Sequence, residues 1–489
     1  MMETISILTA FLLPLLGMMP GAAPTLPNQP PPDPAEEAAR FATVSGQVDL
    51  GGVVFGYLSV DGDLTAIGGY ANSFMEEMRK VQPDVPPVNV PALLEITGLD
   101  AISAAGFSSV ATGDGFRNKT YIHTPKGRRG LLRIMGGDSK PFEVLKLAPA
   151  GSDLVIEQDL NLKTLYQSLL EAAEVQMGEQ GKAMVQMQVR QPLPPPFAFT
   201  LEKVLADLDT QVTVIIDADP TKMVNLPDAK GMKIPQLSGA VLVDGLGWIA
   251  DELAKVLEPM LAQAGNRAPP FKIVRNANWV GMQLAIESKN FSANDRKEIS
   301  ELGWDTAILA HHRPSGKLVL ASGKEFAAKL FSPKSGLDQD PVFQKTMKGL
   351  PVEGTSLTYA SPVFFASLRE FFEKMNDLGN PKEKSHKQDD YLLGSTFINL
   401  LLPENARGEG RVTTNTKDGM LTVSNSAHSH KTSLITGVAS PVVMMVGALY
   451  FQTNMVMEAM DFPEAEQIIE EVEQENRLRP NQDFEKIGD

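Results

Sequence analysis

The chain has no cysteine among its 489 residues. Disulfide bonds, thiolate metal ligands, a catalytic thiol and a lipid-modified N-terminal cysteine are therefore excluded. An exported protein without disulfides has to be stabilised by packing alone. A chain of this length can bury enough apolar surface to achieve that.

Aromatic residues are scarce, at 7% of the chain, and positive charge is in deficit, because the formal net charge is −16. Few aromatics argue against a platform on which bases or sugars stack. An acidic chain without a basic face binds nucleic acid poorly, since that affinity comes from neutralising phosphates. We therefore expect no nucleic-acid partner.

Short catalytic motifs are also missing. The sequence has no G-x-S-x-G, no H-E-x-x-H, no Walker loop and no EF-hand loop. Dispersed carboxylate pairs and triads leave no such motif, so an enzyme stays an alternative. We assign no catalytic residue, expect no cofactor and favour a protein that is not an enzyme.

What the chain does contain is an internal similarity. The pattern His-x-Pro-x-Gly occurs at 123–127 and again at 312–316, each time between apolar runs, which predicts a tight hairpin turn. A strand followed by a helix begins at Leu154 and again at Leu357. Landmarks in the same order predict two tandem copies of one unit.

The predicted fold class is α+β. Strands at 104–111, 116–123 and 130–135 are separated by short turns, which require antiparallel pairing. A helix is expected at 162–176, and Asp219 with the following proline is expected to open another. Antiparallel meanders with attached helices define α+β rather than a doubly wound parallel sheet. The copies are placed at 41–231 and 232–425.

The two ends of the chain predict its location. Residues 1–23 resemble a secretory signal, with a buried or interfacial helix as the alternative, and the Pro-rich residues 24–40 predict an extended spacer. Residues 432–457 predict a transmembrane helix or a buried hydrophobic helix. Residues 458–489 form an acidic tail. We expect an exported protein, periplasmic or anchored to the membrane, whose orientation stays open.

Five segments together resemble a family of exported bacterial proteins whose domain has no assigned function. They are 154–171, 356–375, 318–326, 340–343 and 350–351. The resemblance covers residues 41–425. It implies an envelope protein without an assigned catalytic activity, and it transfers no functional residue.

One dense basic cluster surrounds the first predicted turn. Its members are Lys119, Lys126, Arg128, Arg129 and Arg133. Such a cluster is typical of contact with an anion: phospholipid headgroups, a polysaccharide or the acidic tail of another copy. The alternative is an ordinary solvated turn.

Histidines supply a second candidate site. His428 and His430 are two positions apart, so in a strand both rings would share one face and could bind a metal. The alternative is a polar stretch beside the membrane. His123 and His312 are turn-flanking residues first and catalytic candidates second.

The segment from Gly245 to Ala250 fits G-x-G-x-x-A between a predicted strand and a helix. This is the context of a dinucleotide site, where backbone N–H groups bind a pyrophosphate. Trp248 is bulky at that position, and the next strand ends at Arg275 with no acid for a ribose. We favour a plain strand-to-helix turn.

Together these features predict an envelope protein that is not an enzyme. It would bind a partner or ligand through its sheet faces or the basic hairpin, and the expected partners are an envelope protein, a lipid or a polysaccharide. One alternative is a hydrolase, which should show a deep polar pocket. The other is a lipid carrier, which should show a closed apolar cavity.

Overall fold

The computed structural model describes residues 33–83, 88–194, 197, 199–205, 208–225, 233–264, 270–288, 291–332, 336–378, 402 and 407–432. One compact unit, Thr25–Lys431, contains every helix and strand given below. The signal predicted at 1–23 and the acidic tail lie outside the described residues. The helix predicted at 432–457 does as well, apart from Thr432.

The helices of this unit are mostly short. They are α2 Pro34–Ser45, α3 Asp63–Val81, α4 Val90–Thr97, α5 Leu131–Ile134, α6 Val144–Leu147, α7 Leu162–Arg190, α8 Leu201–Leu205, α9 Gly247–Ala264, α10 Ala293–Leu302, α11 Lys324–Leu330, α12 Pro341–Thr346 and α13 Pro362–Leu378, with 3₁₀ turns η1 Leu99–Ala101 and η3 Leu337–Gln339. None of the described helices is long and apolar enough to cross a membrane.

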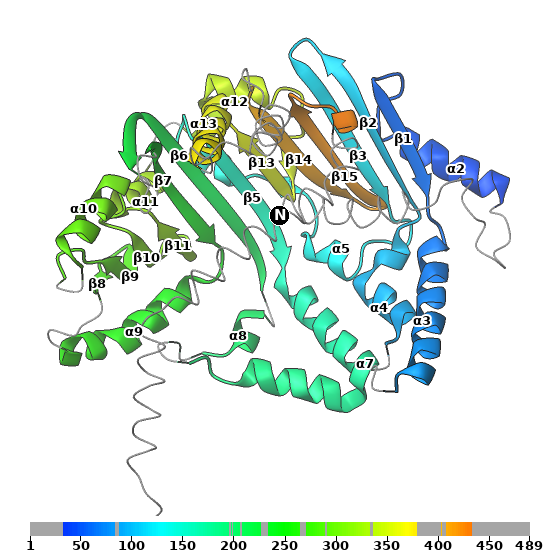
Figure 1. Ribbon diagram of the computed structural model, residues 1–489, viewed down its shortest axis with the longest axis horizontal. Coiled ribbons are helices and arrows are strands. Elements are labelled where there is room, and N and C mark those ends of the chain that lie inside the picture. Colours follow the sequence, from blue (N-terminus) through cyan, green and yellow to red (C-terminus); the bar gives the residue numbers. More distant parts are fainter. Residues whose placement is uncertain are drawn as a thin grey trace, which may run out of the picture. The chain divides into compact units, whose positions relative to one another are not determined.

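The strands form one large sheet and one small one. They are β1 Val54–Ser59, β2 Ala104–Thr112, β3 Gly115–His123, β4 Lys140–Pro141, β5 Leu154–Asn161, β6 Asp209–Asn225, β7 Lys233–Val243, β8 Phe271–Arg275, β9 Trp279–Leu284, β10 Ile308–His312, β11 Lys317–Ala321, β12 Glu353–Gly354, β13 Ser356–Ala360, β14 Glu409–Thr416 and β15 Gly419–Ser426. Among the described residues, thirteen strands join in the order β1-β2-β3-β15-β14-β13-β5-β6-β7-β11-β10-β9-β8 (Figure 1). The small sheet is the pair β4 and β12. Every pairing is antiparallel, so the fold is α+β, as predicted.

The middle of the large sheet is the pairing of β5 with β13. Each of these strands leads into a long helix and then into a β-hairpin: β5, α7, β6 and β7 on one side, β13, α13, β14 and β15 on the other. Ile156 lies opposite Thr358, near the centre of both strands. The sheet therefore grows outward from this seam in both directions.

The seam joins strands from the two ranges in which the copies are predicted. Strands β13–β15 come from 232–425, yet they lie between β3 and β5, which both come from 41–231. Strands from both ranges thus belong to one continuous sheet, and the division into two copies stays a prediction. A duplication in the ancestry of the chain stays a prediction.

One face of this sheet carries the main core. Val155 on β5, Leu357 on β13 and Leu242 on β7 are almost fully buried there, because alternate residues of a strand share a face. Short elements cover them, with Val144 on α6 and Phe343 on α12 in the same cluster. Burying each such side chain contributes about 1.5–3 kcal/mol.

The other face is covered in part by α9, which lies against β9, β10 and β11 (Figure 1). The neighbouring residues His311 and His312 show both faces at once. The ring of His311 contacts Asp251 on α9, whereas the ring of His312 stacks on Phe331. The two rings therefore point to opposite faces of β10.

The hairpin predicted at 312–316 is confirmed, since β10 and β11 pair on either side of it. The strand predicted at 130–135 is wrong, because this segment contains α5. An apolar run this short does not distinguish a strand from a helix. The hairpin predicted at 123–127 is wrong as well, because β3 is followed by α5 and pairs with β2 and β15. The place beside β3 is taken by β15, which pairs with it from Phe116 to His123.

Two further local predictions need correction. The residues from 34 to 40 of the expected spacer lie in α2, because the Asp33 side chain accepts a hydrogen bond from the Ala35 N–H and proline suits the first helical turn. No helix opens at Asp219. Strand β6 continues to Asn225 across a β-bulge, which tolerates Pro220 because its residues leave the ladder.

The seam can be tested by disulfide crosslinking, since the chain has no cysteine of its own. Ile156→Cys with Thr358→Cys should form an intramolecular disulfide on oxidation, because facing residues of neighbouring strands lie within reach. Mass spectrometry of the oxidised protein, digested without reductant, detects the bond.

The matched control for this crosslink is Ile156→Cys with Arg411→Cys. Arg411 faces Thr358 from the next strand, so it lies two strands from Ile156, at about 10 Å. That pair should stay reduced. Crosslinking of the control pair alone would contradict the strand order.

Candidate functional site

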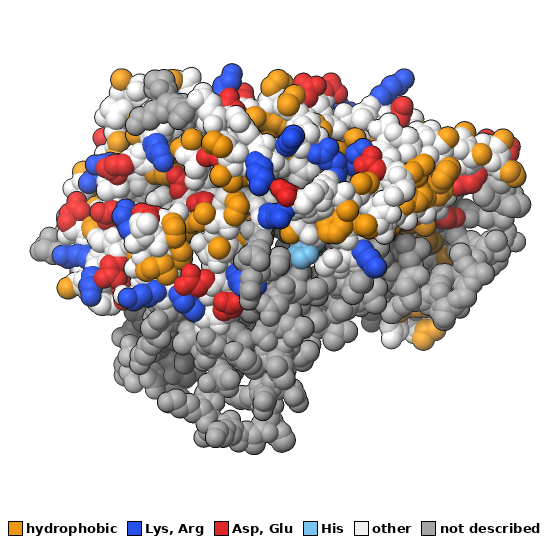
Figure 2. Space-filling view, turned by 90° about the horizontal axis from the view of Figure 1, so that it is seen from above, with side chains coloured by type: hydrophobic (Ala, Val, Ile, Leu, Met, Phe, Trp, Pro, Cys, Tyr) orange, Lys and Arg blue, Asp and Glu red, His pale blue; other side chains and the backbone are white. Residues whose placement is uncertain are grey.

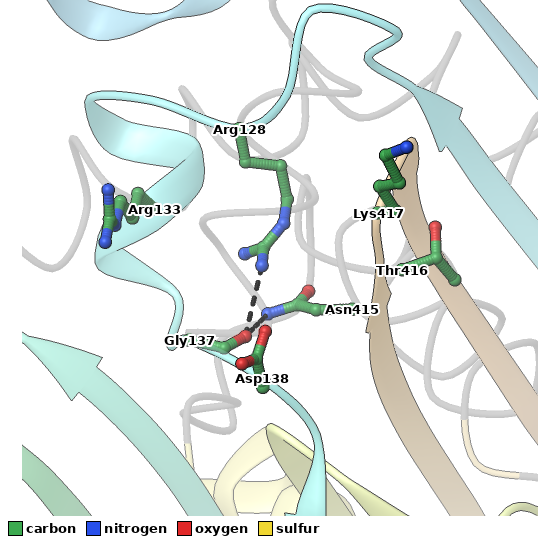
Figure 3. A pocket seen from close by; sticks show the side chains of 7 residues that line it. All are labelled: Arg128, Arg133, Gly137, Asp138, Asn415, Thr416 and Lys417. Atoms are coloured by element: carbon green, nitrogen blue, oxygen red, sulfur yellow. Dashed lines mark hydrogen bonds between the residues drawn. The ribbon is translucent and has the colours of Figure 1, made fainter.

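The clearest candidate site is a surface pocket of about 440 Å³ between α5 and the turn that joins β14 to β15 (Figure 3). We call it the α5 pocket. Its lining residues are Arg128, Arg133, Gly137, Asp138, Asn415, Thr416 and Lys417. The segment between β3 and β4 supplies the first four, and the β14–β15 hairpin supplies the other three.

Arg128 holds one wall of the α5 pocket together. Its half-buried guanidinium donates hydrogen bonds to the carbonyl oxygens of Gly136 at 3.0 Å, Gly137 at 3.1 Å and Leu132 at 3.4 Å. Burial lowers the pKa of Arg128, but a guanidinium titrates so high that it stays charged at any physiological pH. Arg128 therefore positions the loop at 135–139, which joins α5 to β4, and adds positive charge to it.

Asn415 joins the opposite wall to the same loop. Its side-chain amide donates to the carbonyl oxygens of Gly136 at 3.2 Å and Gly137 at 2.8 Å. The Asn415 backbone N–H donates to the Ser139 hydroxyl at 3.0 Å. Residues almost three hundred positions apart thus fix one loop.

Glycine is required at position 136, where the loop packs closely against β5 and the residue before β13. Its φ is 97°, a conformation that residues with a side chain rarely adopt. A Cβ at this position would also lie 2.8 Å from the Cβ of Asp159 and 3.1 Å from that of Thr355. The loop therefore lies directly on the ends of β5 and β13.

Arg133 and Lys417 supply positive charge to the α5 pocket that is available to a ligand. Both side chains are exposed, and neither forms an ion pair within the described residues. Asp138 is the one carboxylate among the lining residues. Figure 2 shows basic and acidic side chains interspersed over the face that it presents. A positive site on such a surface is local.

The structure divides the basic cluster predicted from the sequence. Arg128 and Arg133 line the α5 pocket, whereas Lys126 is exposed outside its lining. Lys119 lies on β3 and pairs with Asp49 at 2.7 Å, and Arg129 pairs with Asp100. Three of the five predicted residues are therefore not part of the pocket.

Sequence reasoning missed Lys417. It lies in the turn between β14 and β15, and a single lysine in a turn carries no local signal. The pairing of β15 with β3 brings this turn to the segment that follows His123. A contact between such distant segments depends on strand order, which the sequence pattern does not specify.

The histidine pair His428 and His430 follows the end of β15 and does not lie in a strand. The His430 ring is within 3.2 Å of the Thr120 hydroxyl, and burial lowers its pKa, so the ring is neutral at pH 7. The His428 Nε2 atom is buried and has no hydrogen-bond partner among the described residues. Within the described part of the chain, no group of three or more possible metal ligands is found. A metal site here stays a prediction.

The turn-flanking histidines are packing residues in this structure. His123 is 8% exposed, stacks on Tyr121 and has its Nδ1 atom 3.0 Å from the carbonyl oxygen of Asp418. His312 has its Nδ1 atom 2.8 Å from the Ser315 hydroxyl, and burial lowers its pKa. Neither lines the α5 pocket.

The G-x-G-x-x-A segment is a close-packed turn. A Cβ on Gly247 would lie 2.1 Å from the His311 ring and 2.8 Å from the carbonyl oxygen of Gly316. The space in which a pyrophosphate would approach this backbone is thus filled by His311, whose Nδ1 is 2.8 Å from Asp251. Glycine is needed here for packing of α9 against β10.

A second group of polar residues, the Glu157 network, lies buried at the seam. Glu157 and Asp159 are two positions apart on β5, so their side chains share a face. The Gln211 side-chain amide on β6 donates a hydrogen bond to each carboxylate at 3.0 Å. Glu157 also accepts a hydrogen bond from the Val144 N–H at 2.6 Å, and Lys140 lies 3.1 Å from Asp159. Burial raises the pKa of Glu157 to about 7.

Comparison with known proteins does not identify either site. No family model, no curated protein and no solved structure matches the chain. The resemblance to exported bacterial proteins therefore remains a prediction from the sequence.

The buried Glu157 should make stability depend on pH. The folded protein keeps the Glu157 proton up to about pH 7, whereas the unfolded chain releases it near its ordinary value of 4.5. Stability should therefore fall as pH rises through this window, by about 3 kcal/mol, since each pKa unit corresponds to about 1.4 kcal/mol. Urea unfolding of the wild type and of Glu157→Gln at pH 5 and pH 8 measures this.

Glu157→Gln should lose most of that pH dependence, because glutamine does not titrate. The comparison is between the slopes of the two proteins, so a constant loss of stability from weaker hydrogen bonding does not affect it. An unchanged slope in the variant would show that Glu157 does not titrate in this range.

Proposed function

We propose that this is a binding protein that is not an enzyme, and that the α5 pocket binds an oxyanion carried by its ligand. The observation that carries the proposal is that Arg133 and Lys417 line one pocket whose loop is already held by Arg128. Guanidinium and ammonium groups are the side chains that bind carboxylates, phosphates and sulfates. Little reorganisation is needed for binding to a loop that is already fixed.

The surroundings support a local anion site. The chain carries a net charge of −16, so a free anion is repelled by the protein as a whole and is attracted where cations gather. A lipid headgroup or an acidic polysaccharide would present such an oxyanion. An envelope location, proposed from residues 1–23 and 432–457, would expose the protein to both.

The alternative classes receive less support. A hydrolase should place several acid and base groups in one pocket, yet the described residues that line the α5 pocket include one carboxylate and no histidine. A lipid carrier should enclose an apolar cavity. A further pocket of about 470 Å³ lies beside Met187 and Pro192 at the end of α7. This pocket is open on the surface, so it is not the enclosed cavity that a lipid carrier needs.

Titration with inorganic sulfate, followed by calorimetry on the full chain, tests the proposal. Sulfate keeps the same charge across the working pH range. Replacing both Arg133 and Lys417 with glutamine should weaken binding at least about tenfold, because hydrogen bonds to charged groups contribute about 1.5–3 kcal/mol each. The wild-type affinity should also fall with added sodium chloride.

The control replaces Lys126 and Lys146 with glutamine. Both are exposed lysines outside the pocket lining, so the net charge changes equally while the α5 pocket stays intact. This control should bind sulfate with nearly the wild-type affinity. Equal affinity of the pocket variant and the control would refute the proposal.

A further inference from the structure

The Glu157 network reaches the loop of the α5 pocket through Asp159. Asp159 meets the loop at Gly136, where a Cβ would come within 2.8 Å of the Asp159 side chain. The carbonyl oxygen of the same Gly136 accepts hydrogen bonds from Arg128 and Asn415 of the pocket. Gly136 therefore lies against Asp159 on one side and accepts hydrogen bonds from two pocket residues on the other.

The buried carboxylates are close enough to act on each other. Gln211 bridges them through a single nitrogen, which is 3.0 Å from Glu157 and 3.0 Å from Asp159. Glu157 is 2% exposed and Asp159 7% exposed, so water screens their charges little. Gaining or losing one charge here changes the electrostatic potential at the loop.

The charged groups around Glu157 are few and identifiable. Glu143 directly precedes α6, and its carboxylate lies 3.3 Å from the ammonium group of Lys317 on β11. Lys317 also pairs with Asp244, which follows β7. Lys140 on β4 pairs with Asp159. On the flanking strands, Glu157 faces the uncharged Leu357 of β13 and Thr213 of β6.

We propose that the Glu157 network regulates the α5 pocket, so that uptake of a proton by Glu157 strengthens the binding of an oxyanion. This inference rests on the proposed function, because it concerns the same pocket. Its direction follows from charge: a neutral Glu157 removes one negative charge from the network that reaches the loop of the cationic pocket. Because burial raises the pKa of Glu157 to about 7, the change falls within the physiological range.

Linkage makes the coupling measurable in two independent ways. Wild-type affinity for sulfate should fall by at least about threefold from pH 6 to pH 8.5, because the negative charge gained by the buried Glu157 repels the divalent anion. By reciprocity, sulfate binding near pH 7 should be accompanied by uptake of part of a proton. Calorimetry in buffers of different ionisation enthalpy measures this uptake.

The key variant is Glu157→Gln, in which both the pH dependence and the proton uptake should disappear while sulfate still binds. The matched control is Asp153→Asn. Asp153 is a buried carboxyl with a raised pKa near the other end of β5, six residues and about 20 Å from Asp159. This control should keep the wild-type pH dependence.

The outcomes separate the two proposals. Absence of sulfate binding at every pH refutes the proposed function and the coupling together. Sulfate binding without proton uptake, or with the same pH dependence in Glu157→Gln, refutes the coupling alone. Proton uptake is measured on the wild-type protein, so the test remains decisive even if the variants fold poorly.

Discussion

The pairing of β5 with β13 is the contact on which the rest of the described structure depends. It joins two strand–helix–hairpin segments edge to edge, and it brings β14 and β15 between β3 and β5. Without this pairing, β15 would not be placed beside β3. The loop after His123 would then lose the hairpin that holds it, and the α5 pocket would have one wall.

The same seam explains why charged residues are buried in the middle of the sheet. Val155 and Leu357 pack in the core, but Glu157 and Asp159 on the same face are satisfied mainly by Gln211, Lys140 and backbone N–H groups. Apolar residues of similar size could stabilise such a position at least as well. A buried carboxylate next to the loop of the α5 pocket is therefore suited to a role other than stability.

Particular residues show how far the sequence predicts the site. The basic cluster after β3 is visible as a run of charge, and Arg128 and Arg133 were identified from it. Lys119 belongs to the same run, but it points from β3 to Asp49 and contributes nothing to the pocket. Charge density alone does not specify which side chains converge. Lys417 shows the reverse case, a pocket residue without a local signal.

The sequence by itself determined the α+β class, the β10–β11 hairpin and the exclusion of thiol chemistry, because these depend on composition and on patterns within a few residues. Tertiary structure alone decided that β15 pairs with β3, that α5 replaces an expected strand and that Glu157 is buried. Those features depend on contacts between segments that lie far apart in the sequence, such as Phe116 and Ser426. Antiparallel strands of similar composition can pair in many orders, and packing of the complete chain selects one.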